Sequence, residues 1–190
     1  MIPRPGRSRA MLAQIFSLLL STIVNLLAGA CLIRLYMQYQ RIPFQNPIGR
    51  FVMALSDWIV LPLRKVLPRL RIDLASLIAA YLIVLAELTL VWALWGRGGW
   101  AMMPVHAIFA LVTMIIWALI ILVLVYTVLC WVRADSYAYD MLDAMCAPLL
   151  RPFRRLIPLV GGVDLSPLAL LVALQILLIV MSGAQGELLR

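Results

Sequence analysis

The sequence contains four apolar runs, each about as long as a helix must be to cross a bilayer. They extend from about Ala10 to Ile33, Leu74 to Trp95, Val105 to Trp131 and Leu165 to Ser182. Crossing a hydrocarbon layer of about 30 Å takes about 20 helical residues. In lipid a helix satisfies its own backbone hydrogen bonds, whereas an open strand does not. The runs therefore predict an all-α membrane protein with four transmembrane helices.

The charge of the chain is strongly positive, but its distribution excludes a nucleic-acid binder. The net charge is +8, and 65% of the residues are apolar, against about 45 to 50% in globular proteins. A nucleic-acid-binding domain places its cations on a soluble face together with polar or aromatic readout residues. Here the cations stand between apolar runs, as they do in the loops of membrane proteins. We expect the partner surface to be a lipid bilayer with anionic headgroups.

The sequence does not predict an enzyme, a cofactor or a metal site. It has three cysteines, without a Cys-x-x-Cys pair, and His106 is the only histidine, so the four ligands of a structural zinc site are not available. No nucleophile, phosphate-binding or dinucleotide-binding motif is present. Cys31 and Cys130 occupy matching places at the ends of the first and third runs, where cysteine usually acts as a small apolar residue.

The first run has two interpretations, a retained helix and a cleaved signal peptide. Three arginines precede it, and "LAGAC" at 27–31 resembles a cleavage site. However, the run is about 24 residues long, whereas a signal core has about 7 to 15. Small and polar residues also recur every four positions in a stripe suited to helix packing: Ser17, Ser21, Asn25 and Gly29. We therefore favour a retained helix.

Four spans place both termini on one side of the membrane and the loops 34–73 and 132–164 on the other. These two loops hold eleven of the sixteen lysines and arginines, and the other side holds five. Because cytoplasmic loops carry the excess of Lys and Arg, both loops are predicted to be cytoplasmic. The three arginines before the first run argue for the opposite orientation.

The two halves of the sequence repeat one pattern, a span, a Cys-x-x-Arg exit, a polar segment, a basic turn, an aspartate and a second span. The matching residues are Pro62, Arg64, Lys65, Pro68 and Asp73 in the first half and Pro152, Arg154, Arg155, Pro158 and Asp164 in the second. The chain thus divides into repeats at 1–98 and 99–190. Since each repeat has two spans, the repeats are parallel, about an axis along the membrane normal.

The polar segments predict amphipathic helices that lie in the interface. Asn46 is a suitable cap for a helix that begins at Pro47. The apolar face of that helix would hold Ile48, Phe51, Val52, Leu55, Trp58 and Ile59, and the polar face Arg50, Ser56 and Asp57. The prolines of each basic turn are expected to limit it to about one turn. Asp73 and Asp164 would cap the spans that follow.

These motifs resemble those of the YggT family of small bacterial membrane proteins, which has relatives in chloroplasts. The likeness is carried by Asn46 and Pro47, by the turn from Pro62 to Pro68, by Asp73, and by "RPFRRLIPLVGGVDLSPL" at 151–168. The second half has no Asn-Pro, and the first lacks the Gly-Gly and Ser-Pro of the second. The resemblance implies a location in a bacterial inner membrane. It also implies a role in assembling membrane proteins or maturing their cofactors, as in relatives linked to haem attachment, or in osmotic tolerance or division-site organisation.

Two sets of residues are candidates for function. Arg64, Lys65, Arg154 and Arg155 are candidates for a composite site that binds lipid phosphate or an acidic partner, or they only anchor the loops. Four cations at about 1 kcal/mol each give about 4 kcal/mol near an anionic surface. Glu87 lies deep in the second span, where acids usually face the protein interior. We expect it to pack inward, with a hydrogen bond to Asn25 or Gln175.

The sequence is consistent with two functions. The first is a non-enzymatic membrane protein that assists the assembly or maturation of a membrane complex, with its basic cytoplasmic loops docking on a membrane-protein partner. The second is a small channel or transporter for osmotic or ion homeostasis. Four helices alone enclose little space, so this second function favours an oligomer.

Overall fold

The computed structural model describes residues 7–66, 73–95, 102–132, 137–156 and 164–188. Within these ranges the regular structure is helical, and no strand is present. The six α-helices are α1 (Arg7–Tyr39), α2 (Pro47–Val66), α3 (Leu74–Trp95), α4 (Met103–Val132), α5 (Tyr137–Leu156) and α6 (Ser166–Leu188). Pro68 of the first basic turn, and Pro158 and the Gly-Gly pair of the second, lie outside the described residues.

Four of the helices, α1, α3, α4 and α6, are long and apolar enough to cross a membrane. This confirms the predicted all-α membrane fold with four spans. α1 continues six residues past the expected end at Ile33, to Tyr39. The reason is that Arg34 is buried in the protein, with 4% of its surface exposed, so this charge does not mark the end of the span.

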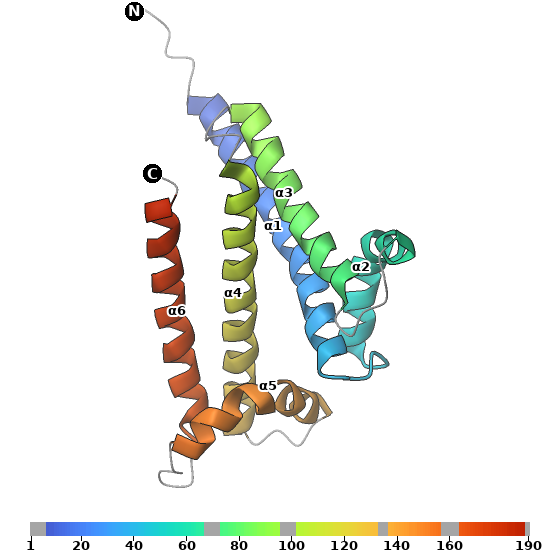
Figure 1. Ribbon diagram of the computed structural model, residues 1–190, viewed down its shortest axis with the longest axis vertical. Coiled ribbons are helices and arrows are strands. Elements are labelled where there is room, and N and C mark those ends of the chain that lie inside the picture. The colour runs from blue at the N-terminus through green and yellow to red at the C-terminus, as the bar shows by residue number, and fades with distance from the viewer. Residues whose placement is uncertain (1–6, 67–72, 96–101, 133–136, 157–163, 189–190) are drawn as a thin grey trace, which may run out of the picture.

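The helices form two like-oriented pairs. α1 packs against α3 and α4 against α6, while α3 and α4 join the two pairs. The amphipathic helices α2 and α5 lie toward one end of the molecule, and both termini lie at the other (Figure 1). This confirms the arrangement of two parallel repeats. The predicted boundary at residue 98 falls outside the described residues.

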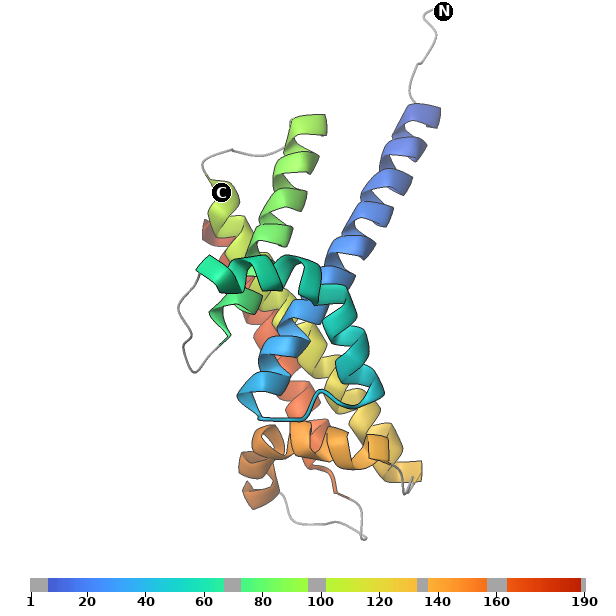
Figure 2. The same ribbon diagram turned by 90° about the vertical axis from the view of Figure 1, so that its right-hand side faces the viewer.

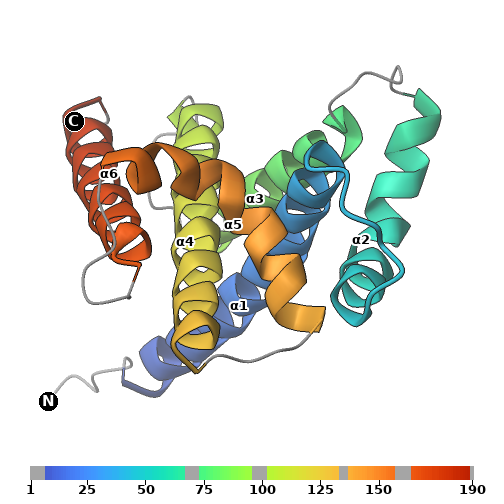
Figure 3. The same cartoon turned by 90° about the horizontal axis from the view of Figure 1, so that it is seen from below.

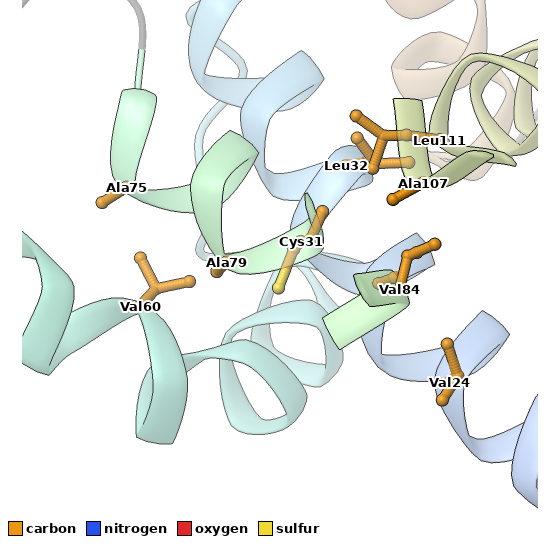
Figure 4. Close-up of a cluster of buried hydrophobic side chains, with 11 residues drawn as sticks. Val24, Cys31, Leu32, Val60, Ala75, Ala79, Val84, Ala107 and Leu111 are labelled. Atoms are coloured by element: carbon orange, nitrogen blue, oxygen red, sulfur yellow. The ribbon is translucent and has the colours of Figure 1, made fainter. Parts of the chain in front are cut away.

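Each repeat has its own apolar core. In the first, side chains of α1, α2 and α3 surround Cys31, Ala79 and Val84, and α4 adds Ala107 (Figure 4). In the second, α4, α5 and α6 enclose a similar cluster around Val123. Cys31 is fully buried among apolar side chains, which agrees with its interpretation as a small apolar residue.

The small-residue stripe of α1 is not the packing face of that helix. The residues of α1 that enter the core are Val24, Ala28, Cys31 and Leu32. In the stripe, Asn25 is exposed, and the hydroxyls of Ser17 and Ser21 donate to carbonyl oxygens of α1 itself, those of Gln14 and Leu18. The expectation that the stripe packs against another helix was therefore wrong, because Val and Leu bury more apolar area one position away.

The prolines of the basic turns do not end the preceding helices. α2 runs through Pro62 to Val66, and α5 runs through Pro148 and Pro152 to Leu156. Both helices bend along their length (Figure 2), since proline removes one backbone N–H and clashes with the preceding turn. The predicted block at Pro62 and Pro152 was wrong. The basic residues instead occupy the last turn of each amphipathic helix.

The shared orientation of the repeats leads to a labelling prediction. In a background without the native cysteines, Lys65→Cys and Arg155→Cys should react with a membrane-impermeant maleimide from the same side of the membrane. Both side chains are exposed at the ends of equivalent helices. Glu187→Cys, near the end of α6, serves as the control for the other side. Labelling of Lys65→Cys and Arg155→Cys from opposite sides would contradict the parallel repeats.

Candidate functional site

The start of α2 is fixed by the residues that precede it. The side chain of Asn46 accepts a hydrogen bond from the backbone N–H of Gly49 and donates one to the carbonyl of Pro43. Asn46 thus caps α2, as the sequence predicts. Gly49 is required here because a Cβ atom would lie 2.7 Å from the carbonyl oxygen of Phe44. The cap sets the rotation of α2 against α1.

This rotation turns Ser56 inward, which the sequence did not predict. Ser56 was assigned to the exposed polar face, but it is fully buried. Its hydroxyl accepts a hydrogen bond from Nη1 of Arg34 at 2.9 Å and donates to the carbonyl of Val52. Nη1 of Arg34 also lies 2.6 Å from Oδ1 of Asp57. Burial of a guanidinium requires such partners, so α2 packs with Ser56, between the buried Val52 and Val60, toward α1.

Asp73 joins the end of α2 to the start of α3. One of its oxygens accepts a hydrogen bond from Nη2 of Arg64 and another, at 2.7 Å, from the hydroxyl of Ser76. Nε of Arg34 lies 3.9 Å from the same carboxylate, and the amide oxygen of Gln38 accepts from Arg64 at 2.9 Å. We call this set the first ion-pair cluster: Arg34, Gln38, Ser56, Asp57, Arg64, Asp73 and Ser76.

The carboxylate of Asp73 stays charged in this environment. Burial alone would raise its pKa, but hydrogen bonds from Arg64 and Ser76, together with the charges of Arg64 and Arg34, outweigh burial and lower the pKa below its usual value. The side chain of Asp73 is 4% exposed, whereas that of Arg64 is 39% exposed. A buried carboxylate thus faces two arginines.

The second repeat contains a related cluster in a more open position. Nε of Arg154 lies 2.9 Å from Asp164, whose other oxygen accepts the backbone N–H of Ser166 at the start of α6. Nη2 of Arg154 donates to the hydroxyl of Tyr126, and this hydroxyl donates to Asp143. We call Tyr126, Asp143, Arg154 and Asp164 the second ion-pair cluster. The hydrogen bonds from Ser166 and Arg154 lower the pKa of Asp164 despite its partial burial.

Both clusters tie the last turn of an amphipathic helix to the beginning of the next span. Arg64 and Arg154 each stand two residues after a helix-bending proline, and Asp73 and Asp164 each precede a span. The aspartates therefore bind these arginines in addition to any capping role. Arg64 and Arg154 thus connect each amphipathic helix to the span that follows it.

The neighbouring cations, Lys65 and Arg155, project outward. Both side chains are exposed, and neither forms an ion pair with a residue in the described part of the chain. The ends of α2 and α5 lie at opposite edges of the molecule (Figure 3). Within a single copy, the two pairs of basic residues are therefore far apart. In the described part of the chain, the end of each helix has an exposed cation next to an arginine that pairs with an aspartate.

Glu87 and Asn25 line one groove between the repeats, and Gln175 does not. The groove has a volume of about 840 Å³, and its walls come mainly from α1, α2 and α4, with Glu87 from α3 and Gln185 from α6. Glu87 is half-buried, while Gln175 is exposed elsewhere. No hydrogen bond joins Glu87 to Asn25 or Gln175 in the described residues. We call this cavity the inter-repeat groove.

The described residues provide no group of three or more His, Cys, Asp or Glu side chains that could hold a metal ion. Cys31 and Cys146 are buried, and Cys130 is half-buried. Burial and then the nearby charge of Asp143 raise the pKa of the Cys146 thiol to about 12, so this thiol is protonated at neutral pH. Nδ1 of His106 lies 3.1 Å from the carbonyl oxygen of Met102 in its own helix.

Sequence reasoning identified four members of the clusters and missed the others. Arg34 was counted only as a loop charge, and Tyr126 and Asp143 were not considered as site residues. One signal for Arg34 is available in the sequence, since an arginine at the end of an apolar run requires an acidic partner if the run continues. The contact of Tyr126 with Arg154, which is 28 residues away, has no local signal.

Comparison with known proteins gives one family. The model of the CCB3/YggT family matches residues 13–94 and, separately, 105–185. Curated relatives include "Uncharacterized protein YggT" of Escherichia coli (strain K12), 32% identical over 84% of this chain and 85% of the relative. Another is "Uncharacterized protein PA0392" of Pseudomonas aeruginosa, 33% identical over 84% of each chain. No solved structure matches.

The two matched segments correspond to the two structural repeats. The first, 13–94, spans α1 to α3, and the second, 105–185, spans α4 to α6. Each segment therefore contains one complete ion-pair cluster between two membrane helices. On this evidence the chain is a multi-pass membrane protein that belongs to the CCB3/YggT family.

Proposed function

We propose that this protein is a non-enzymatic assembly or maturation factor that docks on another membrane protein through the ends of α2 and α5. The supporting observation is that each of these helices ends in a cation that pairs with no acid among the described residues, followed by a strongly exposed apolar residue. Lys65 is followed by Val66, which is 85% exposed, and Arg155 by Leu156, which is 79% exposed. A cation beside an apolar side chain suits an acidic, partly apolar partner surface.

The internal clusters support this proposal because they hold the docking ends in place. Arg64 and Arg154 fix the last helical turn against the next span, so the neighbouring Lys65 and Arg155 leave the helix at a defined position. A preorganised surface binds with a smaller loss of conformational entropy. In a bacterial inner membrane, the positive-inside bias assigns both ends to the cytoplasmic side.

Photocrosslinking in native membranes tests the proposal. A photoreactive side chain in place of Val66 or Leu156 should give adducts with the same membrane protein, and Lys65→Gln with Arg155→Gln should reduce their yield about tenfold. Such a loss corresponds to about 1.4 kcal/mol. A photoreactive group in place of Glu187, at the other end, is the control. Adducts with lipid alone, or adducts insensitive to the two charges, would contradict the proposal.

One observation favours the alternative of a small channel or transporter. The inter-repeat groove holds a half-buried acid within a membrane span, and such acids mark ion pathways in other membrane proteins. Ion flux into proteoliposomes that is abolished by Glu87→Leu would support this alternative over docking. Ion flux equal to that of protein-free liposomes would contradict the channel or transporter alternative.

A further inference from the structure

The inter-repeat groove adjoins a second, smaller groove. The second groove has a volume of about 420 Å³ and lies between α1, α4 and α5. The two grooves share four lining residues: Ile33, Ile48, Ala118 and Ile121. The two grooves therefore adjoin along these residues, and we call them together the seam. Its residues on α4 extend from Ala110 to Val125, a length of about 22 Å at 1.5 Å per residue.

The two parts of the seam differ in chemistry. Every residue of the second groove is apolar except for two tyrosines, Tyr36 and Tyr39. The first groove is also mainly apolar, but it holds the polar side chains of Asn25, Glu87, Thr113 and Gln185. Small-molecule sites commonly combine apolar walls with a few placed polar groups, in volumes of about 300 to 1,000 Å³. The seam therefore has the form of a site for an amphiphile.

The acid in the first groove specifies the charge of that amphiphile. Glu87 forms no ion pair or hydrogen bond with any described residue, and it lies within a membrane span. A carboxylate without a partner inside a bilayer carries a large free-energy penalty, and a bound cation would remove this penalty. Trp117 lines the same groove and is 53% exposed. An indole face is a preferred partner of an ammonium group.

We propose that the seam binds an alkyl-chain amphiphile with a primary ammonium head. The head pairs with Glu87 beside Trp117, and the chain lies along α4 toward Met141 and Met145 of α5, which line the second groove. This inference goes beyond the proposed docking function, because it uses the membrane-embedded surface between the repeats and not the ends of α2 and α5. If binding to the seam is disproved, the docking proposal still stands, and the reverse also holds.

Binding to the full chain in a neutral detergent tests this site. The probe is an alkylamine with a dansyl group at the far end of its chain, and energy transfer from tryptophan reports its binding. We expect the amine to bind about tenfold more tightly than its N-acetylated, uncharged counterpart. Glu87→Gln should reduce this preference to less than about twofold, and Glu187→Gln, which removes an acid outside the seam, should retain it. Equal affinity of the two probes for the unmodified protein would overturn the proposal without any variant.

Competition then identifies the source of the amphiphile. Displacement of the probe by a phospholipid with an ethanolamine head, but not by one with a choline head, identifies the bilayer as the source. Retention of the probe against both identifies a free amine. A photoreactive side chain in place of Ile121 reports other occupants. In native membranes it should form adducts with small amphiphiles, and protein adducts at this position would overturn the proposal in favour of a docked helix.

Discussion

Replacing Asp73 with Asn is expected to lower the free energy of unfolding by about 3 to 5 kcal/mol, the usual effect of removing one partner from a buried ion pair. Asp73 is 4% exposed and faces Arg64 and the equally buried Arg34, so the neutral amide leaves buried positive charge without compensation. The equivalent Asp164→Asn should lower it by about 1 kcal/mol, because Asp164 and Arg154 are more exposed, at 18% and 39%, where water screens the pair.

Unfolding in a mild detergent, followed by circular dichroism, measures both changes, and pH supplies a second readout. The pKa of Asp73 is lower in the folded protein than in the unfolded chain, so its contribution is present above the unfolded pKa and is lost as the pH falls through the folded pKa. The difference between the unmodified protein and Asp73→Asn should therefore be constant near neutral pH and shrink as the pH falls below about 3.9, the pKa of an unperturbed aspartate. An effect of Asp164→Asn equal to that of Asp73→Asn would contradict the assigned difference in burial.

The membrane fold could be predicted from the sequence because it depends on local residue classes. An apolar run of about 20 residues forms a spanning helix whatever it later contacts, and α3 begins and ends at the predicted residues, Leu74 and Trp95. The repeat was also visible, since Arg64 and Asp73 recur as Arg154 and Asp164 at similar spacing. Parallel repeats follow from the count of two spans in each half.

The rotation of α2 and its path through Pro62 could not be predicted from local pattern. A proline inside a helix costs about 3 kcal/mol or more, so the sequence favoured a break at that residue. In the structure, Arg64 follows Pro62 by two residues and binds Asp73 at the start of the next span. This contact, between residues nine positions apart, stabilises the turn that the proline weakens. The balance depends on a tertiary contact, which residue periodicity does not show.

The two repeats share an arginine–aspartate pair, Arg64 with Asp73 and Arg154 with Asp164, and they differ in the residues around this pair. Ser56 of α2 occupies the position of Cys146 in α5, and both are fully buried. The serine hydroxyl accepts a hydrogen bond from Arg34, whereas the thiol of a cysteine is only a weak acceptor. In the second repeat the hydroxyl of Tyr126 contacts Arg154 instead. The first cluster is therefore more buried and holds more charged residues than the second. We expect loss of a charge to reduce the stability of the first repeat more than that of the second.

Arg34→Met is accordingly expected to destabilise the protein by about 3 kcal/mol, and the double variant Arg34→Met with Asp57→Leu is expected to recover part of that loss. The arginine is 4% exposed and binds both Ser56 and Asp57, so methionine leaves two buried or partly buried acceptors without a donor. Removing the acid as well replaces the ion pair by apolar contacts, which is often neutral in a buried position.

A double-mutant cycle isolates this interaction. The coupling free energy between Arg34 and Asp57 should lie in the range of about 1.5 to 3 kcal/mol, the upper part of that found for residues in contact. Arg50→Met is the matched control, because Arg50 lies exposed on α2 and such substitutions usually change stability by less than about 0.5 kcal/mol. A coupling energy near zero would mean that Asp57 does not stabilise the buried guanidinium of Arg34. Asp73 and Ser56 would then have to provide all of its stabilisation. In that case Asp73→Asn should be at the upper end of its expected range, so the two experiments check each other.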